Sequence, residues 1–115
     1  MHKIYSVQAD DRCYEDGLVY TLTTFADKGS AELLKQKIEQ VFYYVEQRAD
    51  KYYNKHPECY LNSVQQRIFE CIKKNQRFKF LKEAHWSDWY NSGPTIMIEE
   101  LELYDSFSDY IMEVK

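Results

Sequence analysis

The chain has little glycine and proline, and its cysteines do not pair. Its 115 residues include three glycines and two prolines. No glycine-rich loop that could cradle a phosphate is present, which argues against a nucleotide-binding fold. Cys13, Cys59 and Cys71 form an odd set without Cys-x-x-Cys spacing, which argues against a zinc site and a disulfide framework. We therefore expect no metal or cofactor.

Catalytic and targeting signals are missing too. Neither a nucleophile-elbow motif nor a His-Glu-x-x-His motif occurs. His85, Ser87 and Asp88 are triad residue types, but closeness in sequence does not make a triad. A hydrolase is the weakest hypothesis, and we expect no enzyme. No signal peptide precedes the chain and no apolar run approaches membrane length, so we expect a cytoplasmic protein without membrane contact.

The clearest pattern is a helical period over residues 27–54. Apolar side chains recur there at steps of three and four, which places them on one face of a helix. Phe42, Tyr44 and Tyr53 widen this stripe, whereas Tyr43 falls on the polar side. Asp27 or Ser30 can cap the helix. The stripe consists of Leu34, Ile38, Val41, Val45, Ala49 and Tyr52.

Three segments have strand character. Residues 3–9 and 18–25 flank a polar loop that ends in Asp16-Gly17, which predicts a hairpin. Residues 95–103 form the third strand. Their apolar phase changes at Glu99-Glu100, which predicts either a β-bulge or a change of packing partner.

A second helix is predicted after a capping box that starts at Ser63. Together with the strands, it gives a single α+β domain over residues 1–115. We expect a small antiparallel sheet of about three strands, packed against one long helix and a second, shorter helix. The inner face of the second helix is expected to carry Val64, Ile68, Cys71 and Ile72.

The formal net charge is only −4, but the charge is unevenly distributed. Residues 67–82 hold six basic residues and one acid. Basic residues interleaved with phenylalanines suit phosphate contact and base stacking. The alternative interpretation is a helix end whose cations favour the C-terminal turn. The candidate nucleic-acid-binding residues are Lys73, Lys74, Arg77, Phe78, Lys79, Phe80 and Lys82.

Residues 99–113 hold six acids and no Lys or Arg, and they run into an acidic-aromatic C-terminal tail over 104–115. A row of carboxylates can imitate nucleic-acid phosphates and compete for a basic groove on a partner. The alternative is a solvated strand edge that prevents aggregation. The candidate partner-binding residues are Glu99, Glu100, Glu102, Asp105, Asp109 and Glu113, with Tyr43, Tyr104 and Tyr110 as anchors.

Two stretches carry a resemblance to other proteins: Phe25 to Glu32, which opens the long helix, and Ile98 to Leu103, the closing strand. Around them the chain resembles small uncharacterised α+β proteins of phages and mobile elements. The likeness covers about half of the chain, and its motifs are structural. It implies a fold class and a phage origin, with no activity to transfer.

These observations predict a non-enzymatic protein-binding protein. The concrete hypothesis is a phage-encoded inhibitor of a host defence system, similar to anti-CRISPR proteins, that works in the host cytoplasm. Its partner would be a nucleic-acid-binding host complex, met by the acidic and aromatic surface. The alternative is a nucleic-acid-binding module that uses the basic segment 73–82. The oligomeric state stays open, a homodimer included.

Overall fold

A three-stranded antiparallel sheet forms one layer of the protein. The computed structural model describes residues 2–12, 17–87, 91–104, 106–108 and 111. The sheet consists of β1 (His2–Asp10), β2 (Val19–Phe25) and β3 (Thr95–Leu103), in the order β2-β1-β3. The helices are α1 (Lys28–Lys55), α2 (Leu61–Lys73) and the short 3-10 helix η1 (Gln76–Leu81). The predicted α+β architecture is confirmed.

The central strand β1 pairs with β3 without any shift in register, from His2 opposite Leu103 to Asp10 opposite Thr95. Of the two alternatives predicted at Glu99-Glu100, the β-bulge is therefore wrong. The apolar phase changes there because Ile96 is buried on the helix side, whereas Leu101 and Leu103 are exposed on the other face.

The one register shift of the sheet, within the described residues, lies between β1 and β2. Val7 is opposite Thr23 and Gln8 is opposite Thr21, so Leu22 is the extra residue of a bulge. Leu22 contacts the core despite lying in a polar Thr-rich strand.

Helix α1 begins after Asp27, as predicted. The Asp27 carboxylate accepts hydrogen bonds from the hydroxyl and the backbone N–H of Ser30, both at 2.8 Å. These bonds lower the pKa of Asp27. Most of the predicted stripe is buried or half-buried, but Tyr52 and Tyr44 are exposed. Their assignment to the buried side was wrong, because both line open hollows between α1 and α2.

Helix α2 begins at Leu61, two residues before the predicted cap at Ser63. The first turn is tied to the segment before β3, because Asn62 Nδ2 donates to the carbonyl oxygen of Ser87 at 2.9 Å. The predicted inner face is right in part, because Ile68 and Ile72 are half-buried against the core. Cys71 is exposed, and the buried residues are Gln65 and Phe69.

An aromatic cluster of Phe42, Phe69 and Trp86 joins α1, α2 and the segment before β3. The Phe42 and Trp86 rings meet edge to face with centroids 5.3 Å apart, and the Phe69 centroid lies 5.7 and 5.6 Å from them. The buried Gln65 completes the cluster. Its Oε1 accepts from Trp86 Nε1 at 3.1 Å, and its Nε2 donates to the Asn91 carbonyl at 2.9 Å.

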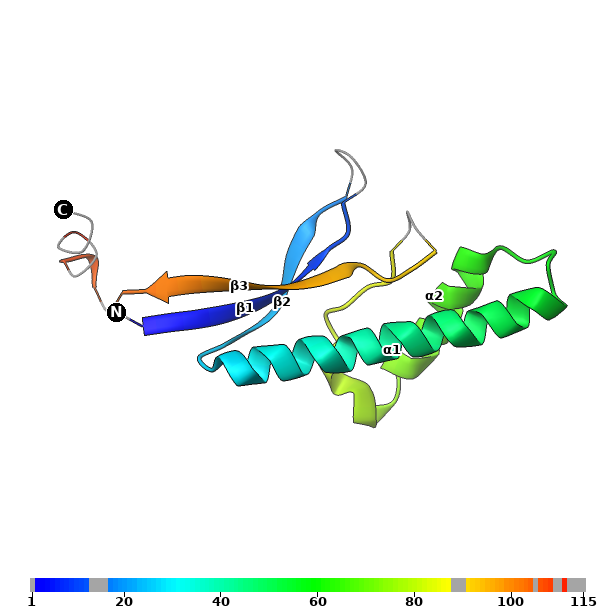
Figure 1. Cartoon of the computed structure of the whole chain (residues 1–115), viewed down its shortest axis with the longest axis horizontal. Helices are drawn as coiled ribbons and strands as arrows, with labels where there is room; N and C mark the ends of the chain where they lie inside the picture. The colour runs from blue at the N-terminus through cyan, green and yellow to red at the C-terminus, as the bar shows by residue number, and fades with distance from the viewer. Residues whose placement is uncertain (1, 13–16, 88–90, 105, 109–110, 112–115) are drawn as a thin grey trace.

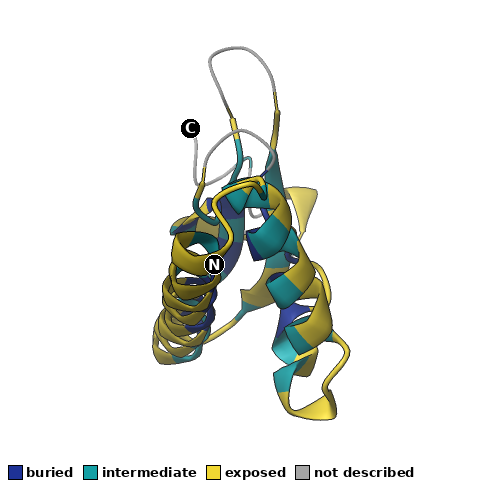
Figure 2. Cartoon of the chain, turned by 90° about the vertical axis from the view of Figure 1, so that its right-hand side faces the viewer, coloured by how far each residue is buried: buried dark blue, intermediate teal, exposed yellow. Residues whose placement is uncertain are grey.

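The two layers overlap only in part, which makes the molecule long. Helices α1, α2 and η1 lie on one side of the sheet, and α1 and α2 extend past it at the end opposite the N-terminus (Figure 1). The radius of gyration is 17.7 Å, against about 13 Å for a compact domain of this length. Buried residues lie where the helices face the sheet and each other, while the outer sides are exposed (Figure 2).

Gly93→Ala tests the aromatic cluster. A Cβ at this position would lie 2.5 Å from Phe42 Cδ2, so Phe42 would have to leave its place against Trp86. We expect a loss of about 1–3 kcal/mol in unfolding free energy, the usual cost of overpacking, measured by urea denaturation. The control is Gly29→Ala in α1, where the nearest atom is 3.3 Å away. Equal effects of the two substitutions would contradict the tight contact at Gly93.

Candidate functional site

A groove runs between α1 on one side and α2 with η1 on the other. It consists of three adjoining hollows of about 530, 410 and 550 Å³. Arg48, Arg67 and Ile68 line both the first and the second hollow. Tyr44, Ile72 and Phe78 line both the second and the third. The three hollows therefore form one continuous surface, which we call the basic groove.

The floor of the basic groove is apolar. Val64, Ile68 and Ile72 follow one another at steps of four along α2, so all three face the same way. Phe78 and Phe80 of η1 extend the floor, with their ring centroids 5.9 Å apart.

The sequence explains why η1 holds these two rings beside the groove. Asn75 caps η1, since its side-chain oxygen accepts from the backbone N–H of Arg77 at 2.9 Å. The buried Leu81 fixes the other end of η1 in the core.

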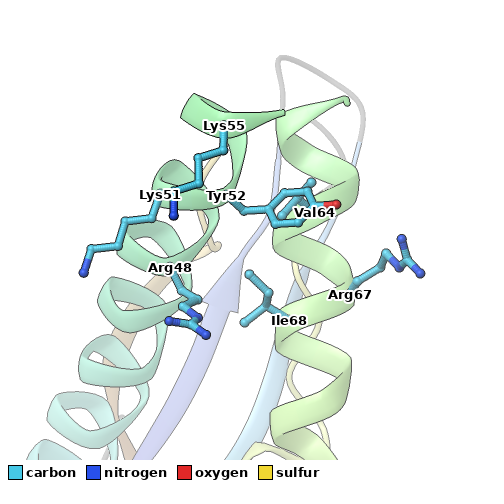
Figure 3. A pocket seen from close by; sticks show the side chains of 7 residues that line it. All are labelled: Arg48, Lys51, Tyr52, Lys55, Val64, Arg67 and Ile68. Carbon is cyan, nitrogen blue, oxygen red and sulfur yellow. The ribbon is translucent and has the colours of Figure 1, made fainter. Parts of the chain in front are cut away.

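The sides of the basic groove are cationic. Six of the chain's fifteen Lys and Arg residues line it, and no described Asp or Glu does. Tyr52 reaches from α1 toward Val64, Arg48 points between the helices, and Arg67 points outward from α2 (Figure 3). Because no described carboxylate lines the groove, the cations produce a local positive field there that attracts an anion. They are Lys37, Arg48, Lys51, Lys55, Arg67 and Arg77.

Helix α1 keeps its acids away from the basic groove. Its acids follow one another at steps of seven, seven and four, which keeps them on one side. None of these four acids lines the groove, whereas four cations of the same helix line it. Burial raises the pKa of Glu46, and the charge of Asp50 raises it further. The spacing of these acids is the signal in the sequence that could have shown which side of α1 faces the groove. The acids are Glu32, Glu39, Glu46 and Asp50.

Two tyrosines of α1 stand on the groove beside these cations. The exposed fractions of Tyr44 and Tyr52 are 55% and 46%. The Tyr52 ring also lies beside the ring of His56, with centroids 4.4 Å apart at 30°. Such partly exposed rings over an apolar floor offer flat faces to a ligand.

The structure divides the basic segment 73–82. Arg77, Phe78 and Phe80 line the basic groove. Lys74, Lys79 and Lys82 are exposed and do not line it. Lys73 has a structural contact, because its Nζ donates to the Ala84 carbonyl at 2.8 Å and lies 5.6 Å from the Phe69 ring centroid.

The acidic candidates are also divided. Glu99, Glu100 and Glu102 are exposed on β3. Because strand side chains alternate, Glu99 lies on the face opposite to Glu100 and Glu102. Each carboxylate meets a neighbour: Gln8 donates to Glu99 at 2.6 Å, Lys3 lies 3.8 Å from Glu100, and the Tyr104 hydroxyl donates to Glu102 at 2.8 Å.

Several acidic and aromatic candidates do not join one described surface. Tyr43 is 64% exposed on α1, as predicted. The C-terminal end of β3 lies beside the N-terminus, at the end of the molecule away from α2 (Figure 1). Asp105, Asp109, Tyr110 and Glu113 lie outside the described residues.

The triad residue types are placed as follows. His85 is exposed, and its ring centroid lies 5.7 Å from that of Tyr20. Ser87 is fully buried, and Asp88 lies outside the described residues. Among the residues that the structure does describe, no group of three or more His, Cys, Asp or Glu is arranged to hold a metal ion.

Comparison of the chain with protein-family models, with curated proteins and with solved structures gives no match. The resemblance to phage proteins therefore stays a prediction. In the described part of the chain, no helix has the length and apolar character needed to cross a membrane.

Lys73→Ala separates a structural lysine from an exposed one. The substitution removes the hydrogen bond to Ala84 and the cation–π contact with Phe69. We expect the free energy of unfolding to fall by about 1–2 kcal/mol, measured by urea denaturation. Lys74→Ala is the control, because Lys74 is exposed and should change stability by less than about 0.5 kcal/mol. Similar small effects of both would contradict the structural role of Lys73.

Proposed function

We propose that the protein is a non-enzymatic nucleic-acid-binding protein whose working surface is the basic groove. The observation that carries this proposal is the composition of the groove lining: six cations, no described carboxylate, and aromatic rings beside them. Cations that neutralise phosphates release counterions, which is the main source of affinity for nucleic acid.

The arrangement of the cations supports the proposal further. They come from three different elements, the consecutive α1, α2 and η1. A solvated helix face would explain a run of lysines on one helix. It does not explain why cations of α1, α2 and η1 all line the same groove while the acids of α1 lie on the opposite side. A common anionic ligand accounts for the convergence.

The test is binding of fluorescently labelled oligonucleotides, followed by anisotropy at several salt concentrations. Each phosphate contact contributes a slope of about −0.7 to −0.9 to log K against log salt. Six contacts therefore predict a slope of roughly −4 to −5. Arg48→Gln with Arg67→Gln should weaken binding more than tenfold near 0.1 M salt and reduce the slope by about 1.4–1.8.

The matched control is Lys79→Gln with Lys82→Gln, which makes the same change in net charge outside the groove. We expect the control variant to bind nearly as the wild type does. Equal loss in the two double variants would place binding on the basic segment rather than the groove. Absence of binding at 20 mM salt would contradict a nucleic-acid function altogether.

A second candidate function is the one expected from the acidic segment: a phage-encoded protein that inhibits a host defence complex. The observation that favours it is that Glu99, Glu100 and Glu102 are all exposed in the second half of an edge strand. A basic protein groove could be occupied by these carboxylates in place of phosphates. This surface lies at the end of the molecule away from α2 (Figure 1).

Charge reversal tests this second candidate. The variant with Glu99→Lys, Glu100→Lys and Glu102→Lys should lose a partner captured from the host by the wild-type protein, because the carboxylates would meet the partner's cations. Its control is Glu32→Lys, Glu39→Lys and Asp50→Lys, which reverses three exposed acids of α1. Thermal melts establish that both variants fold. Capture of the same partner by the β3 variant would end the acidic-surface hypothesis.

A further inference from the structure

Helix α1 presents an alternation of rings and cations to the basic groove. Tyr44, Arg48 and Tyr52 follow one another at steps of four and all line the groove. Each step advances about 6 Å along a helix and stays on one face. The helix therefore places a guanidinium group between two exposed phenol rings.

The floor opposite this row adds further aromatic surface. Phe78 lines the two hollows that Tyr44 also lines, and Phe80 lies in the second of these. Both phenylalanines are half-buried, so part of each ring is accessible from the groove. A ligand that suits this surface has flat faces to stack on rings and negative charges at the cations.

We infer that the ligand is a single strand of nucleic acid, with its bases stacked on Tyr44 and Tyr52; this inference rests on the proposed function. Exposed aromatic rings in a cationic groove are the usual means of binding single strands, because every base has a stacking face. In a double helix the base faces are stacked inside the duplex and cannot reach a ring in a groove. The separate hollows, of about 410–550 Å³, are each of a size that holds a small molecule.

An acidic amphipathic helix of another protein would match the charge of the groove but not its floor. Such a helix needs a continuous apolar strip along its length. Arg48 lines both the first and the second hollow and points between the helices (Figure 3), so its guanidinium group interrupts the strip. Alternating cations and rings favour a ligand whose charges and flat faces also alternate.

The length of the groove sets a site size. From Lys37 to Lys55, α1 rises about 27 Å. At about 3.4 Å per stacked nucleotide, this length accommodates roughly eight nucleotides. Affinity for oligothymidines should therefore increase up to roughly eight nucleotides and then change little.

The experiment compares Tyr44→Ala with Tyr43→Ala in binding to a labelled twelve-nucleotide oligothymidine, its RNA counterpart and a duplex of the same length. Loss of one stacked base weakens binding about 5- to 150-fold. We expect a loss in this range for Tyr44→Ala, little loss for Tyr44→Phe, and no change for Tyr43→Ala. Tyr43 is the matched control because it is exposed on the same helix but does not line the groove.

The salt dependence separates stacking from charge. Tyr44→Ala should leave the slope of log K against log salt unchanged, whereas Arg48→Gln should reduce it by about 0.7. Either single strand should bind at least tenfold more tightly than the duplex. Since Tyr44 is exposed, its variants should melt near the wild-type temperature.

The outcomes distinguish the two levels of the proposal. The single-strand inference would be overturned if the duplex bound as tightly as a single strand, or if Tyr44→Ala and Tyr43→Ala had equal effects. In either case, weaker binding by Arg48→Gln would still support nucleic-acid binding. No binding of any oligonucleotide would overturn the proposed function itself. An acidic helical peptide is the competing ligand. If it bound more tightly than either single strand, and if Tyr44→Ala and Arg48→Gln abolished its binding, the groove would be assigned to a protein ligand instead.

Discussion

The contact of Phe42, Phe69 and Trp86 holds α1, α2 and the segment before β3 in one arrangement. Each ring comes from a different segment, so none of them can be buried unless all three segments meet. Gln65 satisfies the indole N–H and the Asn91 carbonyl, which would otherwise be costly to bury. Gly93 leaves the space that the Phe42 ring occupies. The cluster therefore decides which face α2 turns inward.

The orientation of α2 in turn creates the basic groove. With Phe69 and Gln65 buried, the neighbouring row of Val64, Ile68 and Ile72 is left half-buried toward α1. Beyond the sheet, nothing in the described structure covers this row from the outside, and cations from α1, α2 and η1 line it. The sheet and the helices overlap only in part, which makes the molecule long. The same partial overlap leaves this surface open, with positive charges beside an apolar floor.

Much of the fold followed from local periods in the sequence. The helical stripe predicted α1, which is capped by Asp27 as expected. The alternation in residues 95–103 predicted the third strand with its observed bounds. The start and facing of α2 did not follow, because Ser63 has the form of a cap while Asn62 is held by Ser87, 25 residues away. The period of α2 predicted Cys71 on the buried face. Phe69 is buried there instead, because its ring contacts the rings of Phe42 and Trp86.

The sequence by itself determined the secondary structure and the presence of a basic and an acidic segment, because both depend on residues close together along the chain. Only the tertiary structure decided which charges act together. It joins Arg77 to Arg48 and Arg67 in one groove, turns Lys73 to the Ala84 carbonyl, and separates Glu99 from Glu100 across the sheet. The physical reason is that charges act through space, and the packing of distant rings sets their distances.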